Sequence, residues 1–264
     1  MVIGSRSLLA RLVAVGDIAA SRAPELPLPT YVTIKAGTFP VAGSKLFGDA
    51  KPAVDSVTIT RDFEIGETKV TVAQFKAFVD VTGYEITGQG ANDLKARLAD
   101  PDKQNHPVNF VHRIEAEKAY CKWLDEVEPD YDHFLPTAAQ WELATRGKEG
   151  RLYPWGNRWI PANIVGYHNS PDGTKPVDFA KGATPEGMHD LGNLLEVTRT
   201  WYGQYDPTDT TNPHGPETGN FAEVRGGSRS DARADNFRSA VRRSHAPSDR
   251  DGYYGFRVAR TKKQ

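Results

Sequence analysis

The residues best suited to chemistry lie near the carboxyl end of the chain. Between Gly227 and Gly255 the sequence is rich in Ser, Arg, Asp, His and Tyr and poor in apolar residues, so this segment cannot all be core. Such side chains make adaptable binding surfaces at low entropic cost, although a solvated loop with local Arg–Asp pairs has a similar composition. The candidate ligand-binding residues are Arg229, Asp231, Arg233, Asp235, Asn236, Arg243, His245, Asp249, Asp251, Tyr253 and Tyr254.

Some residues of this region could also transfer protons. Glu196, Ser239, His245 and Tyr254, together with Arg242, are the acid–base candidates for an enzyme that acts on a small molecule. No two of them have a spacing that places them against each other. Arg238 and Arg242 are also typical of anchors, because a guanidinium fixes irregular backbone through forked bonds to carboxylates.

The chain contains one cysteine, Cys121. It falls among apolar residues at helical spacing, with no His or helix start nearby to lower the pKa of its thiol, which favours a structural thiol over a nucleophile. A single cysteine forms no internal disulfide, so the redox compartment stays open. The seven histidines show no metal-ligand spacing such as His-x-x-x-His.

Short regular elements must position these side chains. Alternating apolar residues predict strands over residues 32–42 and 56–65. A capping box, in which a Thr hydroxyl and a Gln amide satisfy free backbone groups, predicts a helix that begins at Thr71 and ends at Gly83. Apolar residues at helical spacing predict a second helix over residues 115–126.

A second capping box at residues 136–140 starts the third predicted helix, which ends before Gly147. Beyond it, from Gly150 to Gly227, Gly, Pro, Asn, Asp and Thr are frequent and apolar runs are short. Regular structure is therefore expected to disappear almost entirely there, and the long loops must be held by something other than strand ladders.

Length and composition indicate a globular domain. With 264 residues, 38% of them hydrophobic, the chain can bury a core without disulfides, and no apolar run approaches the length of a membrane helix. The net charge is -1, but residues 224–264 hold eleven Lys and Arg against four Asp. Because Arg and Asp alternate there, internal pairing is favoured over binding to nucleic acid.

The amino end differs from the rest of the chain. We interpret residues 1–30 as an arm followed by a Pro-rich linker, and residues 31–264 as one domain. The apolar stretch at residues 8–15 is interrupted by Arg11, which favours a short amphipathic arm over a cleaved secretory signal. The localisation is not determined by the sequence, and export or association with a surface or particle stays open.

Several short motifs, each weak by itself, follow one another along residues 33–260. They are AGTF at 36–39, HPV at 106–108, AYCKWL at 119–124, LPT at 135–137, YPWGN at 153–157, GNLLE at 192–196, VRGGS at 224–228 and GFRVAR at 255–260. In this order they resemble the formylglycine-generating enzymes, the sulfatase-modifying factor family. The resemblance implies a C-type-lectin-like α+β fold with short strands, about three helices and much ordered loop.

The resemblance also implies structural calcium, since hard cations collect carboxylate, amide and carbonyl oxygens from loops. At the first site the family pattern assigns side-chain oxygens to Asn163 and Asp172 and backbone oxygens to Ile164 and Thr174. Ordinary Asx turns and hydrogen bonds are the alternative for such loops.

The second calcium site matches the family pattern less well. The pattern assigns Gly192, Leu194 and Glu196 as ligands, preceded by an Asn or Asp three residues before the glycine. His189 stands at that position, and Asp190 follows one residue later. The same Asx-turn alternative applies here.

The oxidase members of the family hold copper on two cysteines shortly before the final GFR motif. Here those positions fall on Ala234 and Ser239, and Cys121 lies far upstream. Soft Cu(I) needs thiolate ligands, so neither copper nor the copper-dependent conversion of a sulfatase cysteine to formylglycine is expected.

Three functions are compatible with these observations. The first is a binding protein for a protein or small-molecule ligand, similar to lectin-like variable proteins that retroelements diversify between anchors resembling residues 224–228 and 255–258. All eleven candidate residues are types reached by substituting adenines in asparagine codons. The second is a cysteine-independent enzyme acting on a small molecule, as in the periplasmic maturation protein of pyoverdine biosynthesis. The third is a structural subunit of a larger assembly, attached through the arm.

Overall fold

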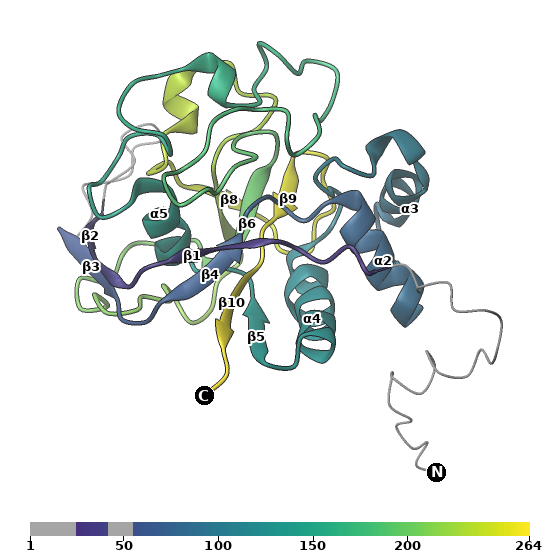
Figure 1. The fold of residues 1–264 in the computed structure, drawn as a ribbon, viewed down its shortest axis with the longest axis horizontal. Coiled ribbons are helices and arrows are strands. Elements are labelled where there is room, and N and C mark those ends of the chain that lie inside the picture. The colour runs from purple at the N-terminus through teal and green to yellow at the C-terminus, as the bar shows by residue number, and fades with distance from the viewer. Residues whose placement is uncertain (1–24, 42–54) are drawn as a thin grey trace.

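Short strands form three sheets, of which the two-stranded one lies at an edge of the protein (Figure 1). The computed structural model describes residues 25–41 and 55–264. In this part of the chain the first sheet has the order β1-β4-β10-β5, and β2 and β3 form a separate ribbon. The strands are β1 (Tyr31–Ile34), β4 (Phe63–Gly66), β10 (Ala259–Lys262), β5 (Tyr131–Phe134), β2 (Gly37–Pro40) and β3 (Ser56–Ile59).

These strands confirm the two segments predicted from alternating apolar residues. Each predicted segment is divided into two strands, β1 with β2 and β3 with β4, because the chain turns between them. The pairing of β4 with β10 joins the amino-terminal part of the domain to its last strand, with Ala259 opposite Ile65. The carboxyl end is therefore part of the central sheet.

The remaining sheet carries the residues of functional interest. Its order is β8-β7-β6-β9, formed by β8 (Arg243–His245), β7 (Ala222–Arg225), β6 (Leu195–Trp201) and β9 (Tyr254–Phe256). Strands β6 and β9 are parallel, whereas the other two pairs are antiparallel. Their apolar side chains form a small cluster of their own. These strands, labelled in part in Figure 1, lie between α5 and α2.

Strands β6 and β7 correct the expectation that regular structure almost disappears before Gly227. Both are buried along most of their length. They alternate apolar residues with buried charged ones, among them Glu196, Glu223 and Arg225. Charged residues normally indicate solvent exposure, so the sequence pattern concealed two central strands.

The helices follow the predicted capping boxes closely. Helix α2 (Val72–Thr82) begins after Thr71 and ends at Gly83, which has φ of 67°, a left-handed conformation that glycine adopts at little cost. The second predicted helix is a π-helical turn, Glu115–Tyr120, that continues into α4 (Cys121–Val127). Helix α5 (Ala138–Arg146) starts at the second capping box.

One further helix, α3 (Ala91–Ala99), was not predicted. Its N-cap is Gly90, which has no side chain to form a cap, and only three of its residues are buried. The described residues therefore contain four α-helices where about three were expected. Three short 3-10 turns complete the list, Pro101–Lys103, Pro161–Asn163 and Ala234–Phe237.

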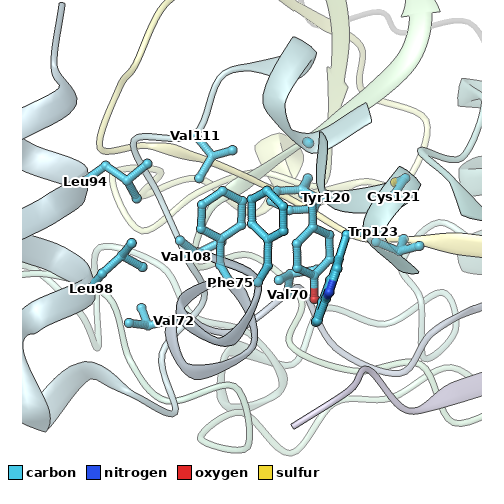
Figure 2. Close-up of a cluster of buried hydrophobic side chains, with 14 of the residues drawn as sticks. Val70, Val72, Phe75, Leu94, Leu98, Val108, Val111, Tyr120, Cys121 and Trp123 are labelled. Atoms are coloured by element: carbon cyan, nitrogen blue, oxygen red, sulfur yellow. The ribbon is translucent and has the colours of Figure 1, made fainter. Parts of the chain in front are cut away.

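The largest apolar cluster lies between the helices and the end of β9. Figure 2 shows Leu94 and Leu98 on one side of Phe75, with Tyr120 on the other. The ring of Phe75 stacks on Tyr120 at 5.5 Å between centroids. Cys121 is buried in the same cluster, and burial raises the pKa of its thiol well above the usual range, which confirms the expectation of a structural thiol.

The segment before β1 also lies against this cluster. Leu26 and Leu28, within the predicted Pro-rich linker, pack against it. The arm at residues 1–23 lies outside the described residues. Within residues 25–41 and 55–264, no helix is both long and apolar enough to cross a membrane.

The capping box of α2 gives a stability prediction. Thr71 accepts a hydrogen bond from the Gln74 amide at 3.2 Å, so Thr71→Ala should lower the free energy of unfolding by about 1 kcal/mol. Urea denaturation measures the loss. Thr87→Ala, at an exposed threonine between the helices, is the matched control and should change it by less than about 0.5 kcal/mol. Equal losses in the two variants would contradict the capping role.

Candidate functional site

Asn193 joins three segments of the chain, at Val165, Lys175 and Arg229, near the polar carboxyl-terminal region. Its side chain donates to the carbonyl of Lys175 at 2.9 Å and accepts from the Lys175 amide at 3.1 Å. Its backbone amide donates to Val165 at 2.8 Å, and its carbonyl accepts from the Arg229 amide at 2.9 Å. Asn193 is fully buried and has φ of 64°, a conformation that Asn tolerates better than most residues. One asparagine thus holds three separate segments.

Next to Asn193, a cluster of buried charges fixes the end of β9. Arg257 forms a forked pair with Glu196, at 3.0 Å from Nε and 3.1 Å from Nη2. The same guanidinium donates to the carbonyls of Gly66, Glu67 and His189 at 2.7 to 2.9 Å. Every Arg257 nitrogen therefore has an acceptor, which satisfies the condition for burying this charge.

Two more side chains complete this cluster. Trp141 of α5 donates to Glu196 at 2.7 Å, and the Lys69 ammonium lies 3.2 Å from the other Glu196 oxygen. Burial alone would raise the pKa of Glu196, but Arg257 and Lys69 outweigh it and lower the pKa to about 2. Burial raises the pKa of the neighbouring Asp190 to about 6. Glu196 is therefore an ionised structural residue and not a free acid–base group.

A second buried ion cluster lies between α5 and β7. Glu142 contacts Arg146 at 2.6 Å and Arg225 at 3.0 Å. Glu223 contacts Arg225 and Arg242 at 2.7 Å each. Arg242 is thus the carboxylate anchor that the sequence analysis favoured.

A cavity of about 40 Å³ beside this second cluster is lined by residues that include Tyr205 and Arg242. It has room for a few water molecules and not for an organic substrate. The phenol oxygen of Tyr205 has no hydrogen-bond partner among the described residues. The cavity therefore borders the buried ion pairs of Glu223 with Arg225 and Arg242.

Two stacked pairs lie in the carboxyl-terminal region, in which Arg229, His245 and Tyr254 are half-buried and Tyr253 is exposed. The Arg229 guanidinium lies 4.4 Å from the centre of the Tyr253 ring, and the His245 and Tyr254 rings stack at 3.7 Å. Tyr253 is 41% exposed. The His245–Tyr254 pair joins β8 to β9, the two edge strands of the sheet, and Tyr254 packs against the apolar side chains of β6 and β7.

Asp231 has a structural role in the same region. It accepts two hydrogen bonds from the Arg243 guanidinium, at 2.7 and 3.1 Å, and one from the side-chain amide of Asn236 at 2.7 Å. It also accepts from the Ser228 amide at 2.8 Å. Since Asp231 and Ser228 are buried, a ligand could reach the half-buried Arg243 and Asn236 but not Asp231 itself.

Accessibility varies among the other candidate residues. Arg233 and Asp249 are exposed, whereas Asp235 and Asp251 are half-buried. Asp235 pairs with Arg238 at 2.7 Å, and Asp251 accepts from the Tyr253 amide at 2.7 Å. The polar segment is therefore partly paired internally, as the solvated-loop alternative required, and partly displayed.

The two positions assigned to the copper cysteines lie close to this surface. Ala234 belongs to the short 3-10 turn before Phe237, and Ser239 follows that turn. Ser239 is buried, and its hydroxyl has no hydrogen-bond partner among the described residues. Its backbone is fixed, because its amide donates to Leu152 at 3.0 Å and its carbonyl accepts from Arg225 at 3.2 Å.

The first predicted calcium loop presents oxygen atoms of the expected kinds. Ile164 is buried, and its carbonyl accepts from Asn169 at 2.8 Å. The Thr174 hydroxyl contacts Arg97 and His106. Asp172 is exposed and has no hydrogen bond or ion pair with another described residue, and Asn163 ends a 3-10 turn nearby.

The histidines are dispersed and bonded to other groups. His133 contacts Asp125 and Glu128, and His189 contacts Glu67 at 2.9 Å. Across residues 25–41 and 55–264, no three His, Cys, Asp or Glu side chains are placed to share a metal ion. A calcium ion bound to the described residues would therefore need amide or carbonyl oxygens in addition to carboxylates.

A family model described as the sulfatase-modifying factor enzyme 1-like domain matches residues 18–262. The chain belongs to this family. The formylglycine-generating enzyme of Mus musculus is 32% identical over 291 aligned residues, which cover 89% of this chain and 76% of that protein. The family therefore accounts for the ordered motifs, and the formylglycine-generating-enzyme-like α+β fold is confirmed.

Solved structures agree on the fold. PvdO from Pseudomonas aeruginosa has a TM-score of 0.72 and 23% identity, and covers 88% of this chain and 94% of its own. Treponema denticola variable protein 1 has a TM-score of 0.69 and 21% identity, with the same coverage. At these identities the likeness extends to the fold alone.

The sequence did not predict that these charged residues form two buried ion clusters. Lys69, Arg225 and Arg257 are among the most buried side chains in the protein. The last two stand inside recognisable motifs, which was the available signal. Lys69 gave no signal, because its partners, Asp190 and Glu196, are more than 120 residues away in the chain.

The pKa of His106 gives a prediction for stability against pH. Burial, helped by Lys103 and Arg97, lowers this pKa from 6.5 to about 4. The unfolded chain therefore binds this proton first as the pH falls, and the contribution of His106 to stability is lost from about pH 6.5 down to about pH 4.

Urea unfolding of wild type and His106→Gln across this range measures the effect. The variant should lose less stability between pH 6.5 and 4 than the wild type does. Parallel curves for the two proteins would contradict the lowered pKa, and a histidine titration by NMR locates it directly.

Proposed function

We propose that the chain is a ligand-binding protein and does not perform the copper-dependent oxidase reaction. The observation that carries the proposal is the surface formed by the Arg229–Tyr253 and His245–Tyr254 stacks, at the edges of a sheet that buried ion pairs support. The positions assigned to the two copper cysteines are Ala234 and Ser239, which offer no thiolate.

The surface suits a binding role because its side chains are already placed. Stacking restricts the rotamers of Tyr253 and Tyr254 before any ligand arrives, which lowers the entropic cost of binding. The Asp231–Arg243 pair ties the loop that follows β7 to β8. Arg233 and Asp249 remain exposed and add charges of both signs. We infer a ligand with polar and aromatic groups, most readily a protein surface.

Diversification of this surface is part of the same proposal. The residue types at the eleven positions fit substitution of adenines in asparagine codons, and the nine positions other than Asp231 and Arg243 can vary without breaking that ion pair. Treponema denticola variable protein 1 shares the fold. The enzyme alternative has less support, because two of its acid–base candidates, Glu196 and Arg242, are held in buried ion pairs.

Calcium in the first loop is a second part of the proposal. Asp172 is exposed and has no partner among the described residues, and the carbonyls of Ile164 and Thr174 are hard oxygen ligands of the kind that the family pattern assigns. A cation there would join the loop after Pro161 to the segment that Asn193 holds. Its role would be structural.

The binding proposal predicts a selective loss of ligand. The triple variant Arg233→Ala, Asp249→Ala, Tyr253→Ala removes exposed groups while leaving the buried ion pairs intact. Proteins captured by the immobilised wild type from extracts of the encoding organism are identified and purified. Interferometry with the purified partner should then show affinity weakened by at least about tenfold in this variant.

A matched control carries three changes on a different face, Lys76→Ala, Asp80→Ala and Lys95→Ala, at exposed positions of α2 and α3. It should capture and bind as the wild type does. If the surface variant captures the same proteins with unchanged affinity, or if the control loses as much, the proposed surface is wrong.

The calcium proposal predicts a cation-dependent melting temperature. Calcium at about ten times its Kd should stabilise the protein by about 1.4 kcal/mol, a rise of about 4 °C over protein in chelator. Asp172→Asn should abolish the rise, whereas the exposed control Asp102→Asn should retain it. Identical melting curves of wild type in chelator and in calcium would contradict the first site.

A further inference from the structure

The second calcium loop of the family pattern contains a lysine side chain. The pattern places a cation against Glu196 and the carbonyls of Gly192 and Leu194. In the structure the Lys69 Nζ lies 3.2 Å from Glu196 Oε1 and 3.5 Å from Asp190 Oδ2, and it donates to the Asp190 carbonyl oxygen. An ammonium ion therefore already contacts three oxygens of this loop.

Lys69 is built into the fold at this position. Its side chain is 0% exposed, so the ammonium cannot turn to solvent without opening the domain. The next residue, Val70, donates to the Phe256 carbonyl at 3.0 Å and accepts from the Val108 amide at 2.9 Å. These backbone bonds fix the segment that directs Lys69 into the loop.

The charges of this loop are balanced without a metal ion. Lys69 and Arg257 supply two positive charges, and Asp190 and Glu196 supply two negative ones. A divalent ion placed among them would lie against the ammonium and the guanidinium with no further carboxylate to offset it. The Gly192 carbonyl is also engaged, because it accepts from the Leu194 amide at 2.7 Å.

The residues of the second loop therefore do not fit a calcium ion. We propose that the Lys69 ammonium permanently takes the place of the second calcium ion, so that this loop is stabilised at any calcium concentration. The shift from His189 to Asp190 fits this arrangement, because Asp190 provides both a carboxylate and a carbonyl to the ammonium, while its other carboxylate oxygen accepts from Asn193 at 3.0 Å.

The test uses a background in which the first loop cannot respond, Asn163→Ala with Asp172→Ala. In that background, with Lys69 intact, calcium at about 1 mM should leave the melting temperature unchanged, and equilibrium dialysis should find no bound calcium. Adding Lys69→Ser removes the ammonium and leaves space between the carboxylates of Asp190 and Glu196. This variant should melt lower in chelator, regain stability in calcium and bind one ion.

Lys69→Met is the matched control, because it fills the same space without charge. Its melting temperature in chelator should also be lower than that of the parent, and calcium should not raise it. Calcium binding or stabilisation in the background with Lys69 intact would overturn the proposal. A Lys69→Met variant with the melting temperature of its parent would also overturn it. So would a Lys69→Ser variant whose melting temperature calcium does not raise. If Lys69→Ser does not fold in chelator, its refolding is compared with and without calcium. Refolding only with calcium supports the proposal, and failure to refold in calcium contradicts it.

Discussion

The forked contact between Arg257 and Glu196 is the interaction on which the other segments depend. It lies where the last strands, the GNLLE motif, the segment before α2 and α5 meet, and each contributes a group to it. Removing one partner of such a buried pair would leave a charge without compensation, at a cost of about 3–5 kcal/mol. The contact therefore specifies the arrangement of loops that short strands alone could not hold.

This construction explains how an irregular surface can be rigid. The outer pairs, Arg229 with Tyr253 and His245 with Tyr254, lie next to backbone that the buried ions and Asn193 fix. Side chains on such a support can be replaced without loss of the fold, provided that inner residues such as Asp231 and Arg243 keep their pair. A binding surface on this fold thus needs no change in the core.

Local signals in the sequence predicted the elements that local chemistry determines. The capping boxes at Thr71 and Thr137 located two helices, and the ordered motifs identified the fold. The sequence did not reveal α3, because its glycine N-cap gives no signal. It also did not reveal β6 and β7, because their charged residues are typical of an exposed segment although they are buried. The placement of Lys69 also depends on partners more than a hundred residues away, which no local pattern contains.

Amide hydrogen exchange of the native chain in chelator tests the central claim most directly, namely that buried ion pairs and Asn193 hold the loops rigid without further ligands. The account predicts that peptides covering residues 190–197 and 253–258 exchange as slowly as α5, because their amides open only with the domain. Exchange of these peptides at the rate of unstructured chain, while α5 stays protected, would contradict it.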